Sequence, residues 1–172
     1  VGGSTITING TLTAPTIEIS GGMEADTITV EPEAFVGNAS VFGGKGDDQI
    51  NIIELDSRTG SLSIDGEEDN DSITIRLTDI DSDNTTETDY VIDVMDSDDG
   101  GPSDGLDSLL IEGSGFTGDT ATNKSDIFLV RENFIAHMHG NADTGVFTTP
   151  LERINYDGSL DGGVTIDSGD GD

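Results

Sequence analysis

Short runs of alternating apolar and polar residues recur along the chain. The clearest is Thr-Ile-Thr-Val at residues 27–30, in which isoleucine and valine alternate with threonine. A period of two places successive side chains on opposite faces of a β-strand, so one face of this strand is apolar and the other polar. No segment has a convincing helical period. The pattern therefore predicts an all-β protein made of many short strands.

These strands belong to a repeat of about 22 residues. Asp26 and Asp48 lie 22 positions apart, as do Ile28 and Ile50, and Asp71 follows Asp48 after 23. A repeat near this length is typical of a solenoid, in which no coil buries its apolar face alone and stacked coils share one core. We therefore expect a right-handed parallel β-solenoid with coils of about 22 residues and Asp-rich loops.

The chain divides into three parts of one continuous domain. Residues 1–78 are predicted to form regular β-solenoid coils, 79–125 irregular coils with acidic loops, and 126–172 further coils that end in a truncated calcium-turn motif. Residues 164–172 resemble the first strand of the repeat and the opening of its turn. We therefore expect the chain to be one piece of a longer tandem array.

The net negative charge of the chain excludes some classes of binding partner. The chain has 36 Asp+Glu against 6 Lys+Arg, a formal net charge of −30, and no cysteine. Nucleic acid and anionic membrane surfaces require basic patches, so neither is an expected partner, and no apolar run is long enough for membrane insertion. A compact state with this charge repels itself, and bound divalent cations would neutralise it. A halophilic surface is the competing explanation, but here Asp recurs at fixed turn positions.

One segment carries a recognisable motif. Residues 43–51, Gly-Gly-Lys-Gly-Asp-Asp-Gln-Ile-Asn, match G-G-x-G-x-D-x-U-x at every specified position. Here the chain resembles the RTX (hemolysin-type) calcium-binding repeat family. The resemblance implies that six residues form a turn, that three form a strand, and that turn carbonyls and the Asp carboxylate ligate calcium between successive turns. Together with residues 125–131, 151–157 and 162–166, it also implies a giant extracellular bacterial surface protein of adhesin type.

Partial copies of the motif begin at Gly21, Gly66, Pro102 and Ser168. Stacked coils would bring Asp26, Asp48 and Asp71 into a ladder, and like charges about 5 Å apart repel by about 1–3 kcal/mol per pair. Carboxylate and carbonyl oxygens suit Ca²⁺ as the neutralising cation. The competing interpretation is solvated turn aspartates. The predicted calcium residues of these turns are Gly22, Asp26, Gly43, Gly44, Gly46, Asp48, Asp69, Asp71, Asp107, Asp170 and Asp172.

The turns on the opposite side, at residues 31–38 and 54–60, lack the motif. Calcium would then follow one edge only, and both a narrow two-sheet β-roll and a wider β-helix remain open. The acidic loop 96–107 is a further candidate, because Asp96, Asp98, Asp104 and Asp107 occupy positions 1, 3, 9 and 12 of a calcium-loop spacing. Loop 79–89 is a weaker one. Neither loop has the flanking helices of an EF-hand.

Function follows from these expectations. We expect a calcium-stabilised structural repeat module of a secreted or cell-surface protein, not an enzyme, which acts as a scaffold, adhesin stalk or filament building block. Self-association or tandem neighbouring repeats would be its partners. The alternative is a carbohydrate-binding or polysaccharide-cleaving parallel β-helix, for which 6 Phe, 2 Tyr and no Trp offer few aromatic platforms. His137 and His139 are interpreted as part of a polar outer face, not as metal ligands.

Overall fold

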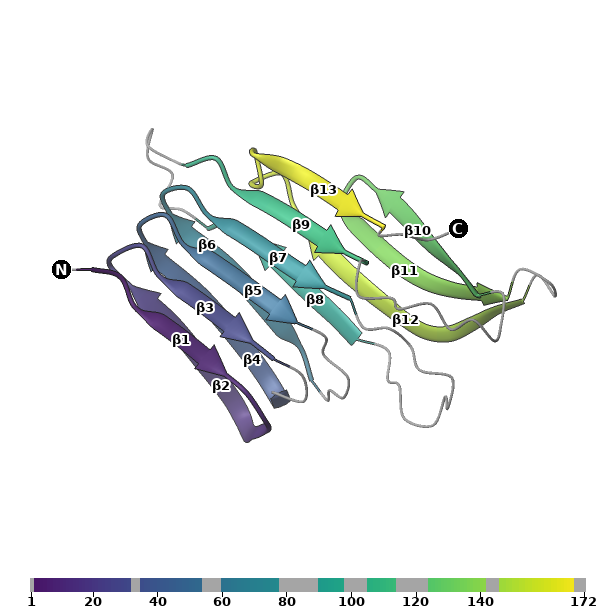
Figure 1. The fold of residues 1–172 in the computed structure, drawn as a ribbon, viewed down its shortest axis with the longest axis horizontal. Helices are drawn as coiled ribbons and strands as arrows, with labels where there is room; N and C mark the ends of the chain where they lie inside the picture. Colours follow the sequence, from purple (N-terminus) through teal and green to yellow (C-terminus); the bar gives the residue numbers. More distant parts are fainter. Residues whose placement is uncertain are drawn as a thin grey trace.

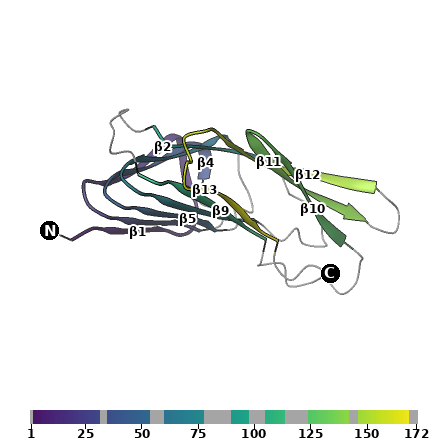
Figure 2. The ribbon, with the colours of Figure 1, turned by 90° about the horizontal axis from the view of Figure 1, so that it is seen from above.

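The computed structural model describes residues 2–31, 35–53, 60–77, 90–97, 105–113, 124–141 and 146–168. Within them it is all β, with two sheets that lie one above the other (Figures 1 and 2). The described residues contain no helix able to span a membrane.

The first sheet, here the parallel sheet, has six strands in the order β1-β3-β5-β7-β9-β13, and every neighbouring pair is parallel. Its strands are short because each crosses the layer once and then turns. They are β1 (Thr5–Ile8), β3 (Thr27–Val30), β5 (Gln49–Ile53), β7 (Ser72–Arg76), β9 (Ser108–Glu112) and β13 (Gly163–Asp167).

The second sheet, here the mixed sheet, has seven strands in the order β10-β11-β12-β8-β6-β4-β2. Pairs from β2 to β12 are parallel, and the two pairs that involve β11 are antiparallel. Its strands are β2 (Leu12–Gly22), β4 (Phe35–Lys45), β6 (Leu62–Glu68), β8 (Tyr90–Met95), β10 (Lys124–Arg131), β11 (Phe134–Asn141) and β12 (Val146–Tyr156).

From β1 to β9 the chain alternates strictly between the two sheets. Ile28 pairs with Ile50, and Ile50 with Ile73, so equivalent residues of successive repeats are neighbours in the parallel sheet. This is the register that the repeat predicts. A slip by one residue would turn every isoleucine to the solvent face, so the apolar pattern fixes the register.

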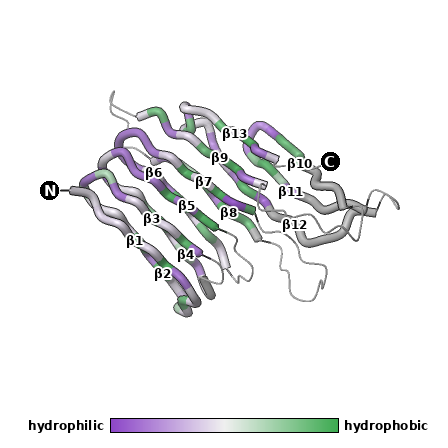
Figure 3. The backbone as a smooth tube through the Cα atoms, in the orientation of Figure 1, coloured by the Kyte–Doolittle hydropathy of each residue, from purple (hydrophilic) through white to green (hydrophobic). Residues whose placement is uncertain are grey.

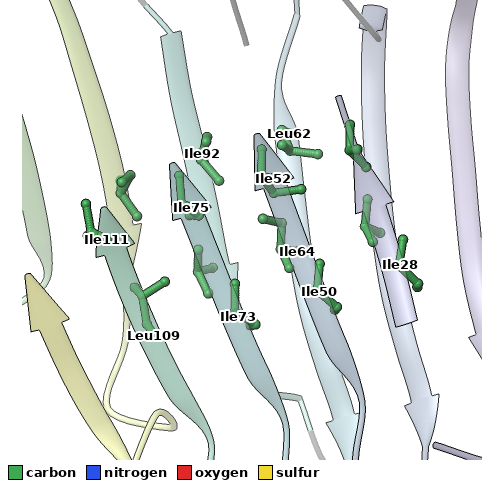
Figure 4. Close-up of a cluster of buried hydrophobic side chains, with 14 of the residues drawn as sticks. Ile28, Ile50, Ile52, Leu62, Ile64, Ile73, Ile75, Ile92, Leu109 and Ile111 are labelled. Carbon is green, nitrogen blue, oxygen red and sulfur yellow. The ribbon is translucent and has the colours of Figure 1, made fainter. Parts of the chain in front are cut away.

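The core lies between the sheets and consists of rows of stacked aliphatic side chains (Figure 4). One row of the parallel sheet comprises Ile28, Ile50, Ile73 and Leu109, each at most 1% exposed. The mixed sheet supplies facing rows that include Leu62, Ile64 and Ile92. Full burial of such a side chain stabilises the fold by about 1.5–3 kcal/mol, so these rows provide the driving force for stacking.

Residues 126–141 do not add a further parallel coil, so the prediction was wrong for this segment, whereas β12 pairs in parallel with β8. β10 and β11 form a hairpin in which Arg131 pairs with Phe134, and β11 runs antiparallel to β12. A two-residue connection closes a hairpin, whereas a parallel neighbour needs a crossover of about a dozen residues or more. The hairpin also changes the environment of His137, which shares a face with Ile135, is 1% exposed and stacks on Phe128 with ring centroids 4.9 Å apart. The outer-face interpretation is therefore wrong for His137, while the exposure of His139 lies outside the described residues.

The segment at residues 164–167 also differs from its prediction. It belongs to β13, which pairs with β9 in the parallel sheet, so it matches the strand that follows the turn and not the strand that precedes it. Val164 lies beside Leu109, and Ile166 beside Ile111. Both kinds of strand have the same period of two, so the sequence pattern does not distinguish them.

Replacement of Ile50 by alanine tests the core. The side chain is fully buried between neighbours above and below, so Ile50→Ala should lower the free energy of unfolding by about 2–5 kcal/mol. Thr29→Ala on the outer face of β3 should change it by less than about 0.5 kcal/mol. Urea denaturation followed by circular dichroism measures both, and equal losses would contradict this assignment of the core.

The aspartate turns as a candidate metal site

Tight turns join the mixed sheet to the parallel sheet at one end of the strands, and hydrophilic residues gather there (Figure 3). β4 ends at Lys45 and β5 begins at Gln49, so three residues reverse the chain. Successive turns lie in backbone contact. Gly44 has a φ of 112°, and a Cβ on it would stand 2.2 Å from the carbonyl oxygen of Gly22. Only glycine permits both this angle and this approach.

Four aspartates occupy the same position in successive turns. Asp26, Asp48, Asp71 and Asp107 are each 1–3% exposed, although they are charged residue types in loops. The structure therefore brings together the three aspartates of the regular repeat and adds Asp107 from the acidic loop as a fourth. Burial contradicts the interpretation that these are solvated turn residues.

Hydrogen bonds join these aspartates into what we call the aspartate ladder. The backbone N–H of Asp26 donates to Oδ1 of Asp48 at 2.6 Å, that of Asp48 to Oδ1 of Asp71 at 2.8 Å, and that of Asp71 to Oδ1 of Asp107 at 2.7 Å. Ser4 donates its N–H to Asp26 in the same way. Each carboxylate thus supplies a hydrogen-bond acceptor where the turn interrupts the pairing of the strands, and the bond joins each repeat to the next.

The second carboxylate oxygen has a different environment. Oδ2 of Asp48, of Asp71 and of Asp107 is buried and has no hydrogen-bond partner. Oδ2 of Asp48 lies 2.6 Å, and the carbonyl oxygen of Gly66 2.5 Å, from the point where a Cβ on Gly43 would stand. A carboxylate and a carbonyl oxygen therefore converge beside Gly43, and both are oxygen ligands of the kind that Ca²⁺ takes.

Burial makes the charge of the ladder costly. It raises the pKa of Asp71 to about 8, with the charges of Asp48, Asp107 and Asp96 acting in the same sense, while the hydrogen bond from Asp48 opposes the rise. Burial likewise raises the pKa of Asp48 to about 6. At neutral pH the carboxyl group of Asp71 therefore favours its protonated form, unless a cation compensates its charge.

Side chains alone do not complete a metal site in the described part of the chain. No three acidic or histidine side chains converge closely enough there to hold an ion. The aspartates contact one another in series, carboxylate to backbone, and do not point at one shared centre. A cation at the ladder would therefore need turn carbonyls such as that of Gly66 as ligands. Calcium at these turns stays a prediction.

The exposed side of the turns holds a second set of contacts between successive repeats. Oδ1 of Asp47 accepts hydrogen bonds from the side chain and backbone of Asn70 at 2.8 and 3.2 Å, which lower the pKa of Asp47. Oδ2 of Asp69 accepts one from the N–H of Gly46 at 3.1 Å. Lys45 and Glu68 form an ion pair at 2.5 Å in which both side chains are exposed. Asp69 thus lies on the surface of the turn, apart from the buried ladder.

The remaining predicted residues are only partly described. Asp96 lies near the ladder, since its charge acts on Asp71, and its backbone N–H donates to Ser159 at 3.0 Å. Gly22 pairs with Gly44 across the turns. Asp98, Asp104, Asp170 and Asp172 lie outside the described residues.

Sequence reasoning missed Asp65, which is 4% exposed. Ser97 donates its N–H to Oδ1 of Asp65 at 2.8 Å and its hydroxyl to Oδ2 at 2.5 Å. Asp65 pairs with Phe42 in the preceding repeat, and Phe42 pairs with Ser20, so this position has no constant residue type that could have marked Asp65. Its carboxylate fastens the segment after β8 to the turn.

Comparison with known proteins identifies no relatives. No family model matches the chain, and it has no significant match among curated proteins or solved structures.

The raised pKa values predict how stability depends on pH when calcium is chelated. The ordinary pKa of Asp71 is 3.8, so between that value and about 8 the folded chain keeps a proton that the unfolded chain releases. The free energy of unfolding should therefore fall as pH rises through this window. Thermal melting in chelator should show a melting temperature that drops by several degrees between about pH 5 and about pH 8.

Asp71→Asn is the matched control for that experiment. The amide keeps the Oδ1 acceptor for Asp48 but cannot ionise, so the decline above about pH 6 should become shallower. A melting temperature that rises with pH in the wild type would show that the ladder is ionised in the folded state without a cation.

Glu67 occupies a position where the preceding turn has glycine. Its φ is 71°, and it pairs with Gly44. A non-glycine residue in this region costs about 1–2 kcal/mol. Replacement by glycine removes this strain, but the gain is partly cancelled because glycine loses more conformational freedom on folding. Glu67→Gly should therefore stabilise the protein by about 0.5–1 kcal/mol, measured by denaturant unfolding.

The neighbouring substitution Glu68→Gly separates this effect from loss of charge. Both variants remove one acid from the same turn, but Glu68 does not have a positive φ and loses its ion pair with Lys45. It should destabilise by up to about 1 kcal/mol. If both variants shift stability in the same direction, backbone strain at Glu67 does not explain the result.

Proposed function

We propose that this chain is a calcium-stabilised structural repeat module of a secreted or cell-surface bacterial protein, which acts as a scaffold, adhesin stalk or filament building block. The observation that carries the proposal is the aspartate ladder, with three buried Oδ2 atoms that lack a partner. Its architecture would be a parallel β-solenoid, for which the alternation of strands between two sheets is the support.

The coil lengths support a solenoid. Equivalent aspartates are separated by 22, 23 and 36 residues, yet their turns stack directly, so longer coils place their extra residues in loops. Two layers favour the narrow β-roll form over a wider helix with three sheets. Parallel crossovers of this kind are almost always right-handed.

Calcium fits the residues present at the turns. A chain with a net charge of −30 gains from a divalent cation, and the Oδ2 atoms of Asp48, Asp71 and Asp107, with neighbouring turn carbonyls, would hold it. When bound, calcium would supply the positive charge that the buried carboxylates lack. The ladder would then stay ionised at neutral pH.

Such dependence suits an extracellular role. Sites of this class bind calcium with dissociation constants of about 0.1–1 mM, so they fill outside the cell and not in the cytosol. A module whose coils repel without calcium and stack with it would become rigid after secretion. The RTX-like nonapeptide at residues 43–51 supports the same role.

Thermal melting at neutral pH and fixed ionic strength tests the proposal. Calcium should raise the melting temperature above its value in chelator, and magnesium should not reproduce the shift. One site with a Kd of about 1 mM contributes about 1.4 kcal/mol at about 10 mM calcium, or about 3–6 °C for a chain of this size.

A charge-matched pair of triple variants locates the effect. The ladder variant Asp48→Asn, Asp71→Asn, Asp107→Asn should lose most of the calcium shift, because the amides keep the Oδ1 acceptors but not the charge. The control Glu18→Gln, Glu132→Gln, Asp161→Asn removes three exposed acids and should keep it. If the wild type does not respond, or the ladder variant responds fully, calcium at the ladder is excluded. A carbohydrate-binding β-helix then becomes the better reading.

A further inference from the structure

The end of the molecule beyond β9 is stepped. The parallel sheet finishes with β13, whereas the mixed sheet continues through β12 and β11 to β10 and has one strand more. In two perpendicular views β10 lies beyond β13 (Figures 1 and 2). We call this feature the stepped end.

Apolar side chains are incompletely covered at the stepped end. Val130 of β10 pairs with the buried Ile135, so it faces the inner side of the sheet, yet it is 49% exposed. Val164 and Ile166 of β13 are only partly buried, while their neighbours Leu109 and Ile111 are at most 1% exposed. The core therefore opens to solvent at this end.

Two strand edges are also unpaired there. Among the strands that the structure describes, β13 pairs with β9 alone and β10 with β11 alone, so each has an outer side to which no described strand is paired. Such edges pair readily with another chain unless charge or proline blocks them. Residues 124–141 hold two basic and two acidic residues, so this part is neutral in a chain of −30. The edge strand β10 thus adds no net negative charge of its own to a contact with β13, which carries Asp167.

Head-to-tail stacking does not fit the stepped end. At the opposite end β1 and β2 are joined directly as the first strands of the two sheets, which leaves no step. A translated copy must advance both sheets by one distance. At about 4.8 Å per strand, however, six strands span about 29 Å and seven about 34 Å. One strand position would stay empty at every junction.

A two-fold axis parallel to the strands removes this mismatch. We propose that a second copy of this chain docks on the stepped end through such an axis. The rotation exchanges the two layers, so β10 of one copy lies beside β13 of the other. The longer layer of each copy thus meets the shorter layer of its partner, and no strand position stays empty. Inner faces stay inside, because the axis lies between the layers. The interface is isologous and closes as a dimer.

This inference rests on the proposed function only through its two-layer architecture, and calcium takes no part in the contact. The new pairs of β10 with β13 would be antiparallel, because these two strands run in opposite directions (Figure 1) and the rotation leaves strand direction unchanged. A rotation about an axis parallel to the strands leaves the position of each residue along the strand direction unchanged. Val130 therefore faces Val130 of the second copy across the layers, where each covers the other.

Sedimentation velocity over a range of concentrations, in calcium at neutral pH, tests the interface. The wild type should form dimers, and Val130→Lys should raise the dimer Kd by about tenfold or more, because an inward charge at the joint has no partner. Leu12→Lys, which charges the 39% exposed side chain on the edge strand at the opposite end, should leave the Kd unchanged. Circular dichroism checks that both variants fold. We expect Val130→Lys to fold, because this side chain is half exposed in the monomer.

Crosslinking gives a second readout on the naturally cysteine-free chain. Packed sheets lie about 10 Å apart, so a thiol crosslinker of about that reach should join Val130→Cys chains into covalent dimers and should not join Leu12→Cys chains. A folded monomer at all concentrations overturns the inference. A series of higher oligomers that Leu12→Lys abolishes also overturns it, because such oligomers would use the opposite end of the molecule. A folded protein without a calcium response that still dimerises would refute calcium at the ladder and leave the dimer standing.

Discussion

Stacking of successive repeats in one register is the constraint on which the rest of this structure depends. The aliphatic rows bury their side chains only if Ile28, Ile50 and Ile73 lie one above another, and the short strands have few residues with which to fix that alignment. The aspartate ladder fixes it at the turns. There each backbone N–H finds a carboxylate of the next coil and each glycine lets the backbones touch. Hydrophobic burial drives the stacking, and the turn hydrogen bonds make the alignment specific.

That solution places negative charge where it is least stable. A neutral acceptor would make the same hydrogen bond without the cost of burial, so the use of aspartate calls for a reason beyond the bond to the next coil. The unpartnered Oδ2 atoms supply one, because they make the stability of the turns responsive to protons or cations. A scaffold that assembles outside the cell gains from such dependence. Under the proposed function, the repeats would hold together where calcium is abundant and would be weakened where it is scarce.

The antiparallel hairpin changes how this array ends. A pure stack of coils would leave two flush ends, suited to indefinite translation. Three strands of the last coil region instead lie side by side in the mixed sheet, which lengthens one layer by a strand. The short connection between β10 and β11 causes this, since two residues close a hairpin and do not cross to the other layer. The same hairpin buries His137 and leaves Val130 half exposed.

The sequence by itself determined the repeat, the all-β class, the inward isoleucines and the positions of three turn aspartates, because a period of two and a constant spacing are properties of the chain alone. Tertiary structure decided what no spacing contains. It made Asp107 the fourth member of the ladder across a gap of 36 residues, buried Asp65 against Ser97, and gave the aspartates hydrogen bonds to one another in series. It also placed residues 164–167 in the parallel sheet. These outcomes depend on which segments become neighbours after folding, and an alternating pattern is the same for every strand that could occupy a given place.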